Sequence, residues 1–337
     1  MDLEELTEAF LEMGEKAFRA KQVFSWLWEK GCTDFNQMTN LSIELREKLN
    51  QQFCFNQISL DLSQVSADDT IKYRFRLYDG SLIESVLIPV HDQKRYTVCV
   101  SSQVGCSLSC SFCATGKMKR VRNLDAGEIY DQIYMVHQDC MKRYGYKVTS
   151  IVYMGMGEPL LAYKSVMRSI MLLTSSQGLG MSPKRITIST AGIAKMIKKL
   201  ADDAGKVNLA LSLHAADDLK RNEIMPINEQ NNLAVLMDAL RYFYEKTKNR
   251  ISYEYIAFDN FNVFEEDANN LIKLCRSFPV RINIIEYNPV EGVEMIRAKR
   301  GDVDSFAQKL TDAGITVTVR RSRGKDIDAA CGQLANK

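Results

Sequence analysis

The first 55 residues carry apolar positions at the spacing of α-helices. The segment RAKQVFSWLWEKG would place one apolar stripe on a helix face, made of Val23, Phe24, Leu27 and Trp28. NLSIELREKLNQQF repeats the pattern, and Ser42 near its start is of a residue type that caps helix N-termini. We therefore expect a small helical domain at the start of the chain.

From residue 69 to residue 90 the pattern changes to the alternation of β-strands. In IKYRFRLYDGSLIESVLIPV, two alternating runs flank Asp79 and Gly80, a pair favoured in tight hairpin turns. Beyond it, strand-like stretches alternate with longer amphipathic ones, which is typical of a parallel sheet covered by helices. The strand-like stretches are YTVCV, SIVYM, RITIS, VNLALSL, ISYEYIAF and RINIIEY.

The helical stretches between these strands carry recognisable start signals. Asp125 and Glu128 have the spacing of a capping box, and an apolar stripe follows them at Ile129, Ile133 and Val136. Six β/α units are fewer than the eight of a closed TIM barrel. The fold class is therefore α/β, and we expect an open, partial (β/α)6 barrel of the TIM type, with a doubly wound sheet as the alternative.

Composition indicates an ordinary globular protein. The chain has 337 residues, of which 46% are hydrophobic and 26% charged, values that exclude a disordered or collagen-like chain. No apolar run approaches the roughly 18 residues of a membrane helix, and the start MDLEELTEAF is acidic, unlike a signal peptide. We expect a soluble cytoplasmic protein with no membrane partner.

Nine cysteines without an export signal indicate reduced thiols and metal or redox chemistry. In CSLSCSFC, three of them have the spacing C-x3-C-x2-C directly after YTVCV: Cys106, Cys110 and Cys113. Three thiolates this close converge only if the segment loops around a metal or cluster. A zinc ion normally takes four ligands, and Cys140 lies far away in a predicted helix, whereas a four-iron cubane with three thiolates keeps one iron open. A zinc knuckle with a distant ligand and plain core cysteines are the alternatives.

The cysteine spacing, with Phe112 before the last cysteine, resembles that of the radical S-adenosylmethionine (SAM) superfamily. VCVSSQVGC, GMGEPLL, SLHAA, MPIN, YNP and DIDAACGQL narrow the resemblance to the RlmN/Cfr family of RNA methyltransferases, over nearly the whole chain. The resemblance implies one 4Fe-4S cluster held by Cys106, Cys110 and Cys113, with SAM on the open iron and two SAM molecules used per turnover. It also implies an external electron donor such as flavodoxin or ferredoxin.

Several residues lie at the carboxyl ends of the predicted strands, where a β/α barrel collects its ligand contacts. They are Gly157, Glu158, Ser189, Ser212, Leu213, His214 and Asn288. The resemblance implies that Gly157 and Glu158 hold the amino group of SAM and that the others contact its sulfonium and ribose. Taken alone, Glu158 would be a solvated turn residue, His214 a satisfied interior histidine and Asn288 a turn residue before Pro289.

Three further residues are candidates for the chemistry itself. Cys331 has small neighbours in AACGQL, and the basic residues of RRSRGK would favour its thiolate if they fold nearby; a buried structural cysteine is the alternative. The resemblance implies that Cys331 carries a methyl group and that Cys99 resolves the intermediate through a transient disulfide. It also implies that Glu84 accepts a proton, although a strand carboxylate is ordinarily solvated.

Basic residues are nearly balanced by acidic ones, 44 against 42, so only local clusters bear on a polyanionic partner. One such cluster is KMKRVR, another is RRSRGK, and Arg19 and Lys21 lie in the first helical segment. They fit phosphate contacts to an RNA substrate, with a solvated surface as the alternative.

The resemblance implies methylation of carbon 2 of an adenosine in 23S rRNA, with tRNA as a second substrate, through an S-methylcysteine. Pro159 resembles this branch, whereas the carbon-8 branch often has alanine there. Carbon-8 methylation, another RNA, a radical enzyme acting on a peptide or metabolite, and a non-catalytic metal-binding RNA module are the alternatives. Ala162, where asparagine is common, and FDNFNVF, in place of a Gly-Val-Asn-Asp loop, depart from the family near the active face.

We therefore divide the chain into four parts and expect a monomer. They are a helical RNA-binding accessory domain (1–60), a β-hairpin bridge (61–91), a radical SAM core (92–321) and a tail that carries the methyl-carrier cysteine (322–337).

Overall fold

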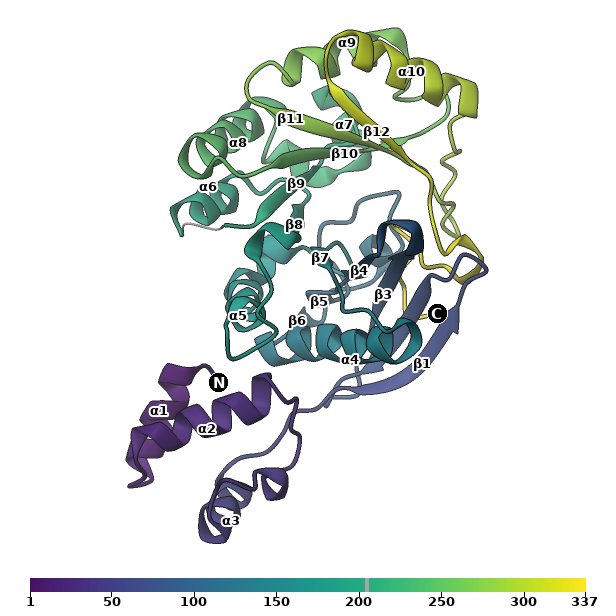
Figure 1. Cartoon of the computed structure of the whole chain (residues 1–337). Coiled ribbons are helices and arrows are strands. Elements are labelled where there is room, and N and C mark those ends of the chain that lie inside the picture. The colour runs from purple at the N-terminus through teal and green to yellow at the C-terminus, as the bar shows by residue number, and fades with distance from the viewer. Residues whose placement is uncertain (204–205) are drawn as a thin grey trace.

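The computed structural model describes residues 1–203 and 206–337 and contains a ten-stranded sheet bent into an arc (Figure 1). The strands follow one another in chain order across it: β1 (Ser59–Val65), β2 (Ile71–Arg76), β3 (Leu82–Val90), β4 (Arg95–Cys99), β7 (Ser150–Tyr153), β8 (Ile186–Thr190), β9 (Asn208–Ser212), β10 (Ile251–Ala257), β11 (Val280–Glu286) and β12 (Thr316–Arg320). Two short strands, β5 (Gln103–Val104) and β6 (Arg122–Asn123), pair separately.

The strands from β4 to β12 pair in parallel, each beside the one before it. A doubly wound sheet would reverse its strand order at a switch point, so this order confirms the open partial barrel. The six strands expected from the sequence are all present. β12 is a seventh parallel strand that the sequence analysis did not predict.

Four antiparallel strands, β1 to β4, extend the barrel sheet at one side. The predicted hairpin is present as β2 and β3, and a turn containing Asp79 and Gly80 joins them. β1 was not predicted, because SLDLSQV is polar and largely exposed at the sheet edge, where little apolar periodicity is needed.

Seven longer helices cover the barrel strands, with α6 and α8 packed against each other and α9 against α10 (Figure 1). They are α4 (Ala126–Tyr144), α5 (Tyr163–Thr174), α6 (Ala194–Asp202), α7 (Asp218–Ile224), α8 (Leu233–Thr247), α9 (Glu265–Leu274) and α10 (Arg300–Asp312). α4 begins with the predicted capping box, in which the Asp125 amide donates to Glu128 at 2.9 Å. None of the helices in the described residues has the length and apolar character needed to cross a membrane.

The predicted N-terminal helices are α1 (Leu3–Glu12), α2 (Ala17–Trp28) and α3 (Ile43–Gln52). The Ser42 hydroxyl caps α3 by accepting from the Leu45 amide at 3.3 Å. Trp28 packs edge-on against Tyr130 of α4, with ring centroids 5.1 Å apart, and the Tyr130 hydroxyl donates to the Trp28 carbonyl. These contacts fix the helical segment to α4, below the barrel in Figure 1.

The two faces of β2 and β3 meet different parts of the chain. Tyr73 and Ser85 face α4, where their hydroxyls donate to Asp139 and Gln132. The opposite face carries Glu84, which accepts from backbone amides of the C-terminal residues. The last residues of the chain therefore return to the antiparallel strands, as the yellow segment of Figure 1 shows.

Candidate active site at the carboxyl ends of the strands

The three-cysteine loop follows β4 and is fixed by backbone contacts to distant elements. Ser111 donates from its amide to the Ile224 carbonyl at the end of α7, at 3.0 Å. Gly105 opens the loop with φ +73°, and a Cβ there would lie 2.3 Å from the Lys119 carbonyl oxygen, so only glycine fits. The loop thus has a defined path between β4 and α7.

Cys106, Cys110 and Cys113 are all partly exposed on this loop. Burial raises the pKa of each thiol, to about 11 for Cys106. Within the described residues, no three His, Cys, Asp or Glu side chains are close enough to hold one metal ion. In an iron-sulfur cluster each thiolate binds a different iron, so the three sulfurs need not converge on one point. Three thiols on one fixed loop fit a 4Fe-4S cluster with one open iron.

Gly157 and Glu158 follow β7 and join its end to the neighbouring strand. Gly157 has φ +96°, and a Cβ there would lie 2.5 Å from Gln103, so the backbone can turn only with glycine. The buried Glu158 carboxylate accepts from the amides of Leu160 at 3.0 Å and Ala191 at 2.8 Å. Burial raises its pKa to about 7. Each carboxylate oxygen has a further lone pair that can accept from a ligand ammonium.

The ends of β8, β9 and β10 bring the other predicted SAM contacts together. The hydroxyls of Ser189 and Ser212 lie 3.5 Å apart. His214 accepts from the Ile256 amide at Nδ1, 3.1 Å away, and its ring stands edge-on to Phe112 of the cysteine loop at 4.7 Å. Leu213 is fully buried, its amide donates to the Glu254 carbonyl at 3.0 Å, and its carbonyl accepts from Arg221 at 3.0 Å.

Burial lowers the pKa of His214 to about 3, so the imidazole is neutral. Because Nδ1 accepts a hydrogen bond, its proton resides on Nε2. His214 can therefore be both a satisfied interior histidine and a ligand contact. Nδ1 accepts from the Ile256 amide, and the N–H at Nε2 can donate to a ligand.

Asn288 follows β11 and faces the C-terminal tail, defined as residues 322–337. Its Nδ2 lies 3.4 Å from the Cys331 carbonyl oxygen. Its buried Oδ1 has no hydrogen-bond partner among residues 1–203 and 206–337. Buried polar atoms are almost always paired, so this oxygen fits a contact to a bound molecule such as SAM.

The tail places Cys331 beside the cysteine loop. The Ala114 amide donates to the Gly332 carbonyl at 2.7 Å, and the Thr115 hydroxyl donates to the Leu334 carbonyl at 2.6 Å. Cys113 directly precedes Ala114, and Cys331 directly precedes Gly332. One hydrogen bond therefore joins the chain neighbours of the two cysteines. Sequence alone separates them by more than 200 residues.

The two thiols expected to react with each other are close enough to interact electrostatically. Burial of the thiol is the main cause that raises the pKa of both cysteines. All nine cysteines lie in the described residues and are free, so no disulfide joins Cys99 and Cys331 in this structure.

The sequence analysis expected the basic segment RRSRGK to favour the thiolate of Cys331 if it folded nearby. In the structure, the pKa of Cys331 is raised instead. Burial, followed by Glu254, raises the pKa of Cys331 and outweighs Arg320, the residue of this segment whose charge lowers it. Arg321 and Lys325 pair with Glu286, at 2.6 and 2.8 Å. Arg320, Arg321 and Lys325 of this segment are therefore paired with carboxylates of the barrel strands.

KMKRVR is also engaged internally. Lys117 donates to the carbonyls of Glu291 and Gly292, and Arg122 pairs with Asp79 and Glu128. Lys21, Lys119 and Arg120 are exposed. Lys117 is exposed as well, although it donates to these two carbonyls.

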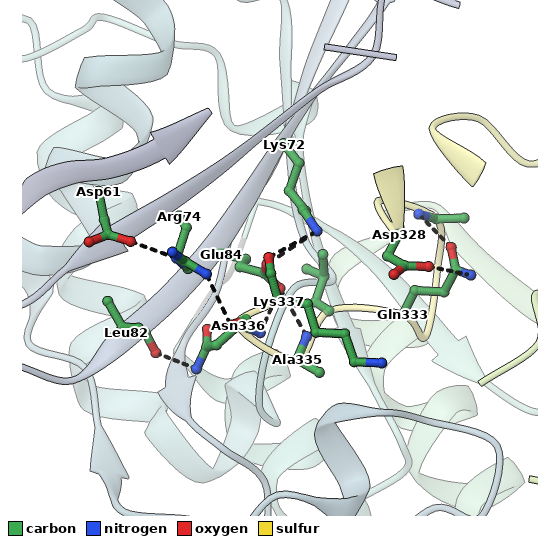
Figure 2. A network of polar contacts seen from close by, with 12 residues as sticks. Asp61, Lys72, Arg74, Leu82, Glu84, Asp328, Gln333, Ala335, Asn336 and Lys337 are labelled. Atoms are coloured by element: carbon green, nitrogen blue, oxygen red, sulfur yellow. Dashed lines mark hydrogen bonds and ion pairs between the residues drawn. The ribbon is translucent and has the colours of Figure 1, made fainter. Parts of the chain in front are cut away.

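Glu84 is fully buried and not part of a solvated face (Figure 2). Its carboxylate pairs with Lys72 at 3.4 Å and accepts from the amides of Ala335 and Asn336. The register places Glu84, Val86 and Cys99 on one face of the sheet, because Cys99 lies directly opposite Val86. Glu84 and Cys99 therefore share the face that the tail covers.

Sequence reasoning missed Arg221, which is fully buried on α7. Its guanidinium donates to the carbonyls of Leu213 at 3.0 Å and Ala191 at 2.6 Å, and to the Asn228 side chain at 2.5 Å. Burial lowers its pKa to about 10. Arg221 ties the ends of β8 and β9 together beneath the cysteine loop, and an arginine on an ordinary amphipathic helix gives no sequence signal for this role.

Sequence reasoning also missed Glu254, a buried carboxylate on β10. One oxygen accepts from Ser252 at 2.8 Å and Asn283 at 2.7 Å, and the other lies 3.7 Å from Arg320. A glutamate within the apolar strand ISYEYIAF is a signal that could have identified it.

Comparison with known proteins agrees with this geometry. Two family models match: the Ribosomal RNA large subunit methyltransferase N-terminal domain over residues 1–55, and the Radical SAM superfamily over residues 100–275. A probable dual-specificity RNA methyltransferase RlmN of Cytophaga hutchinsonii is 52% identical over 337 residues, spanning 100% of this chain and 92% of that protein.

A second relative and one solved structure are also similar over almost their full lengths. The dual-specificity RNA methyltransferase RlmN of Campylobacter fetus is 42% identical over 95% of this chain and 93% of that protein. The crystal structure of a radical SAM methyltransferase from Sphaerobacter thermophilus matches with a TM-score of 0.94 and 38% identity, covering 100% of this chain and 98% of that one.

Proposed function

Because this chain belongs to the RlmN family of radical SAM RNA methyltransferases, we propose that it methylates carbon 2 of an adenosine in 23S rRNA, and of one in tRNA, through an S-methylcysteine at Cys331. The observation that carries the proposal is the bond from the Ala114 amide to the Gly332 carbonyl. It sets the proposed methyl carrier beside the loop that would hold the cluster.

The cofactors supply the difficult chemistry and the protein places the reacting groups. When bound, the 4Fe-4S cluster and SAM supply the one-electron chemistry that removes a hydrogen atom from a methyl group. Cys106, Cys110 and Cys113 would hold the cluster. SAM would be held by Gly157 and Glu158 at its amino group, and elsewhere by Ser189, Ser212, His214 and Asn288.

Cys331 acts first, because carbon 2 of adenine lies between two nitrogens and is too electron-poor to attack a methyl group directly. The Cys331 sulfur accepts a methyl group from one SAM and releases its thiol proton. After that methyl group loses a hydrogen atom, its carbon bonds to carbon 2 of the adenine. Cys331 is then joined to the RNA.

Cys99 and Glu84 would complete the reaction. The adduct would first give up its unpaired electron, which the cluster can take up when bound, and its ring proton, which Glu84 accepts. The Cys99 sulfur would then attack the Cys331 sulfur, so that an S–S bond forms while the bond between Cys331 and the new methyl carbon breaks, and the Cys99 thiol proton completes the methyl group. An external reductant such as flavodoxin or ferredoxin then returns both cysteines to thiols. The influence of the Cys331 charge on the pKa of Cys99, and the sheet face that Glu84 and Cys99 share, support this order.

Two features support an RNA substrate and carbon 2 as its target. The relatives at 52% and 42% identity carry the name dual-specificity RNA methyltransferase, and residues 1–55 match a ribosomal RNA methyltransferase domain. Pro159 follows Glu158, as in the carbon-2 branch. We propose that residues 1–60 contact the RNA and that the enzyme acts as a monomer.

The test is an anaerobic reaction of the reconstituted protein with SAM, a reductant and unmethylated 23S rRNA or tRNA. Mass spectrometry of the digested RNA is expected to show 2-methyladenosine, and Cys331→Ala is expected to remove it. The appearance of 8-methyladenosine in its place would assign the enzyme to the carbon-8 branch. Cleavage of SAM with no methylated adenosine in either RNA would contradict the proposed substrates.

A further inference from the structure

A buried ion pair lies directly beneath the tail (Figure 2). Lys72 Nζ on β2 and Glu84 Oε1 on β3 are 3.4 Å apart, and their side chains are 3% and 0% exposed. Removing two charges from water is costly, and their attraction offsets that cost only when further hydrogen bonds satisfy the remaining polar atoms. Those further partners identify what this pair does.

The partners are backbone atoms of the tail. Glu84 Oε2 accepts from the amide of Ala335 at 2.9 Å and from that of Asn336 at 3.0 Å. Lys72 donates to the Lys337 carbonyl at 3.4 Å. Asn336 has φ +62°, a left-handed conformation that asparagine tolerates and that helps two consecutive amides converge on one oxygen.

Neighbouring contacts complete the anchor. Arg74 donates to the Asn336 carbonyl at 3.2 Å, and the Asn336 side chain donates to the Leu82 carbonyl at 2.8 Å. All these partners come from β2 and β3, far from the tail in sequence. The tail therefore lies in a fixed position on this sheet.

The anchor and the cysteine loop hold the tail at two places. Gly332 and Leu334 are bonded to the loop, and the next two residues are bonded to Glu84. Cys331 lies immediately before the first of these bonds. Its position is therefore set by a short segment whose far end depends on the Lys72–Glu84 pair.

We propose that Lys72 and Glu84 are positioning residues, whose buried charges anchor the tail and so place Cys331 between the cysteine loop and Cys99. The part of this inference that concerns methyl transfer rests on the proposed function, whereas the anchoring does not. The two oxygens of Glu84 have separate partners: Oε2 accepts from the two tail amides, and Oε1 lies 3.4 Å from the Lys72 ammonium.

The test compares amide hydrogen exchange in the wild-type holoenzyme and in the double variant Lys72→Met/Glu84→Met. Replacing both members of a buried pair with apolar residues of similar size is often neutral for stability, so the variant is expected to fold. Because two amides lose their acceptor, exchange at Ala335 and Asn336 is expected to become about tenfold faster or more. Exchange in β7 and β8 is expected to stay unchanged.

Arg76→Met is the matched control. Arg76 lies on the same face of β2 and pairs with Asp61, which Arg74 also holds, and Arg76 makes no contact with the tail in the described structure. Its removal is expected to leave the exchange of Ala335 and Asn336 unchanged. Unchanged exchange at these amides in a folded double variant would overturn the anchor.

A second readout tests positioning, and it is the S-methyl occupancy of Cys331 in protein purified from cells, measured by peptide mass spectrometry. The S-methyl occupancy of Cys331 in the double variant is expected to be at least about fivefold lower than in the wild type, because the sulfur no longer meets SAM in a fixed geometry. A loosened tail with full occupancy would overturn the positioning role. Absence of methyl-cysteine from the wild type would contradict the proposed function, while the exchange result would still decide the anchor.

Discussion

His214 Nδ1 accepts a hydrogen bond from the backbone amide of Ile256 over 3.1 Å. This bond joins the end of β9 to β10 and fixes which imidazole nitrogen keeps the proton. It also leaves Nε2 as the only nitrogen of this ring that can donate to a ligand.

The first prediction follows from that bond. Burial lowers the pKa of His214 to about 3, so its ¹⁵N resonances are expected to show a neutral ring protonated at Nε2 throughout pH 5 to 8. Because the folded pKa lies below the unfolded one of about 6.5, the stability that neutral His214 contributes is present above that pH and is lost as the pH falls toward 3. A ring that titrates near pH 6.5 in the folded protein would contradict this.

Glu158 gives a pH dependence of SAM binding. Burial raises its pKa to about 7, and the ionised carboxylate attracts the SAM ammonium more strongly than the neutral acid does. SAM affinity is therefore expected to rise up to about tenfold per unit as the pH increases toward 7 and to level off above it. Isothermal titration with Glu158→Gln should show weak binding without this slope. A flat profile for the wild type would count against Glu158 as the ammonium partner.

Arg221→Met tests the link between β8 and β9. The substitution leaves the carbonyls of Leu213 and Ala191 without their donor, and buried unsatisfied acceptors cost about 1–3 kcal/mol each. We expect the free energy of unfolding to fall by about 3 kcal/mol, measured by denaturant titration. Arg241→Met, at an exposed position of α8, is the control and should change stability by less than about 0.5 kcal/mol. Equal effects of the two substitutions would show that Arg221 is not a structural tie.

Cys331→Ala separates methyl transfer from SAM cleavage. The variant retains Cys106, Cys110 and Cys113, so it is expected to bind the cluster and to release 5′-deoxyadenosine from SAM while forming no methylated RNA. Chromatography of the small-molecule products and mass spectrometry of the RNA measure the two outcomes. Methylated RNA from this variant would remove Cys331 from the reaction.

The sequence predicted the elements whose apolar periodicity faces the core. The six barrel strands, the Asp125 cap of α4 and the Ser42 cap of α3 are all present, because buried strands and helix caps depend on local residue types. β1 was missed because most of its positions are exposed and SLDLSQV carries little apolar periodicity, whereas TVTVR of β12 does alternate, so its signal was present and was not used.

The site was predictable where one loop carries it and unpredictable where distant segments meet. Cys106, Cys110 and Cys113 were predicted from their spacing alone. The burial of Glu84, by contrast, depends on Lys72 of the neighbouring strand and on the tail, which lies some 250 residues later in the chain. Arg321 and Lys325 were misread for the same reason. Their partner Glu286 lies on β11, and only the fold reveals that pairing.

The most direct test of methyl transfer through Cys331 uses the Cys99→Ala variant with SAM, reductant and RNA. Without the Cys99 sulfur, the bond between Cys331 and the new methyl carbon cannot be broken by disulfide formation. Protease and nuclease digestion followed by mass spectrometry is expected to find an adenosine linked through one carbon to the Cys331 peptide. Release of methylated RNA at the wild-type rate, with no such linked peptide, would contradict the account.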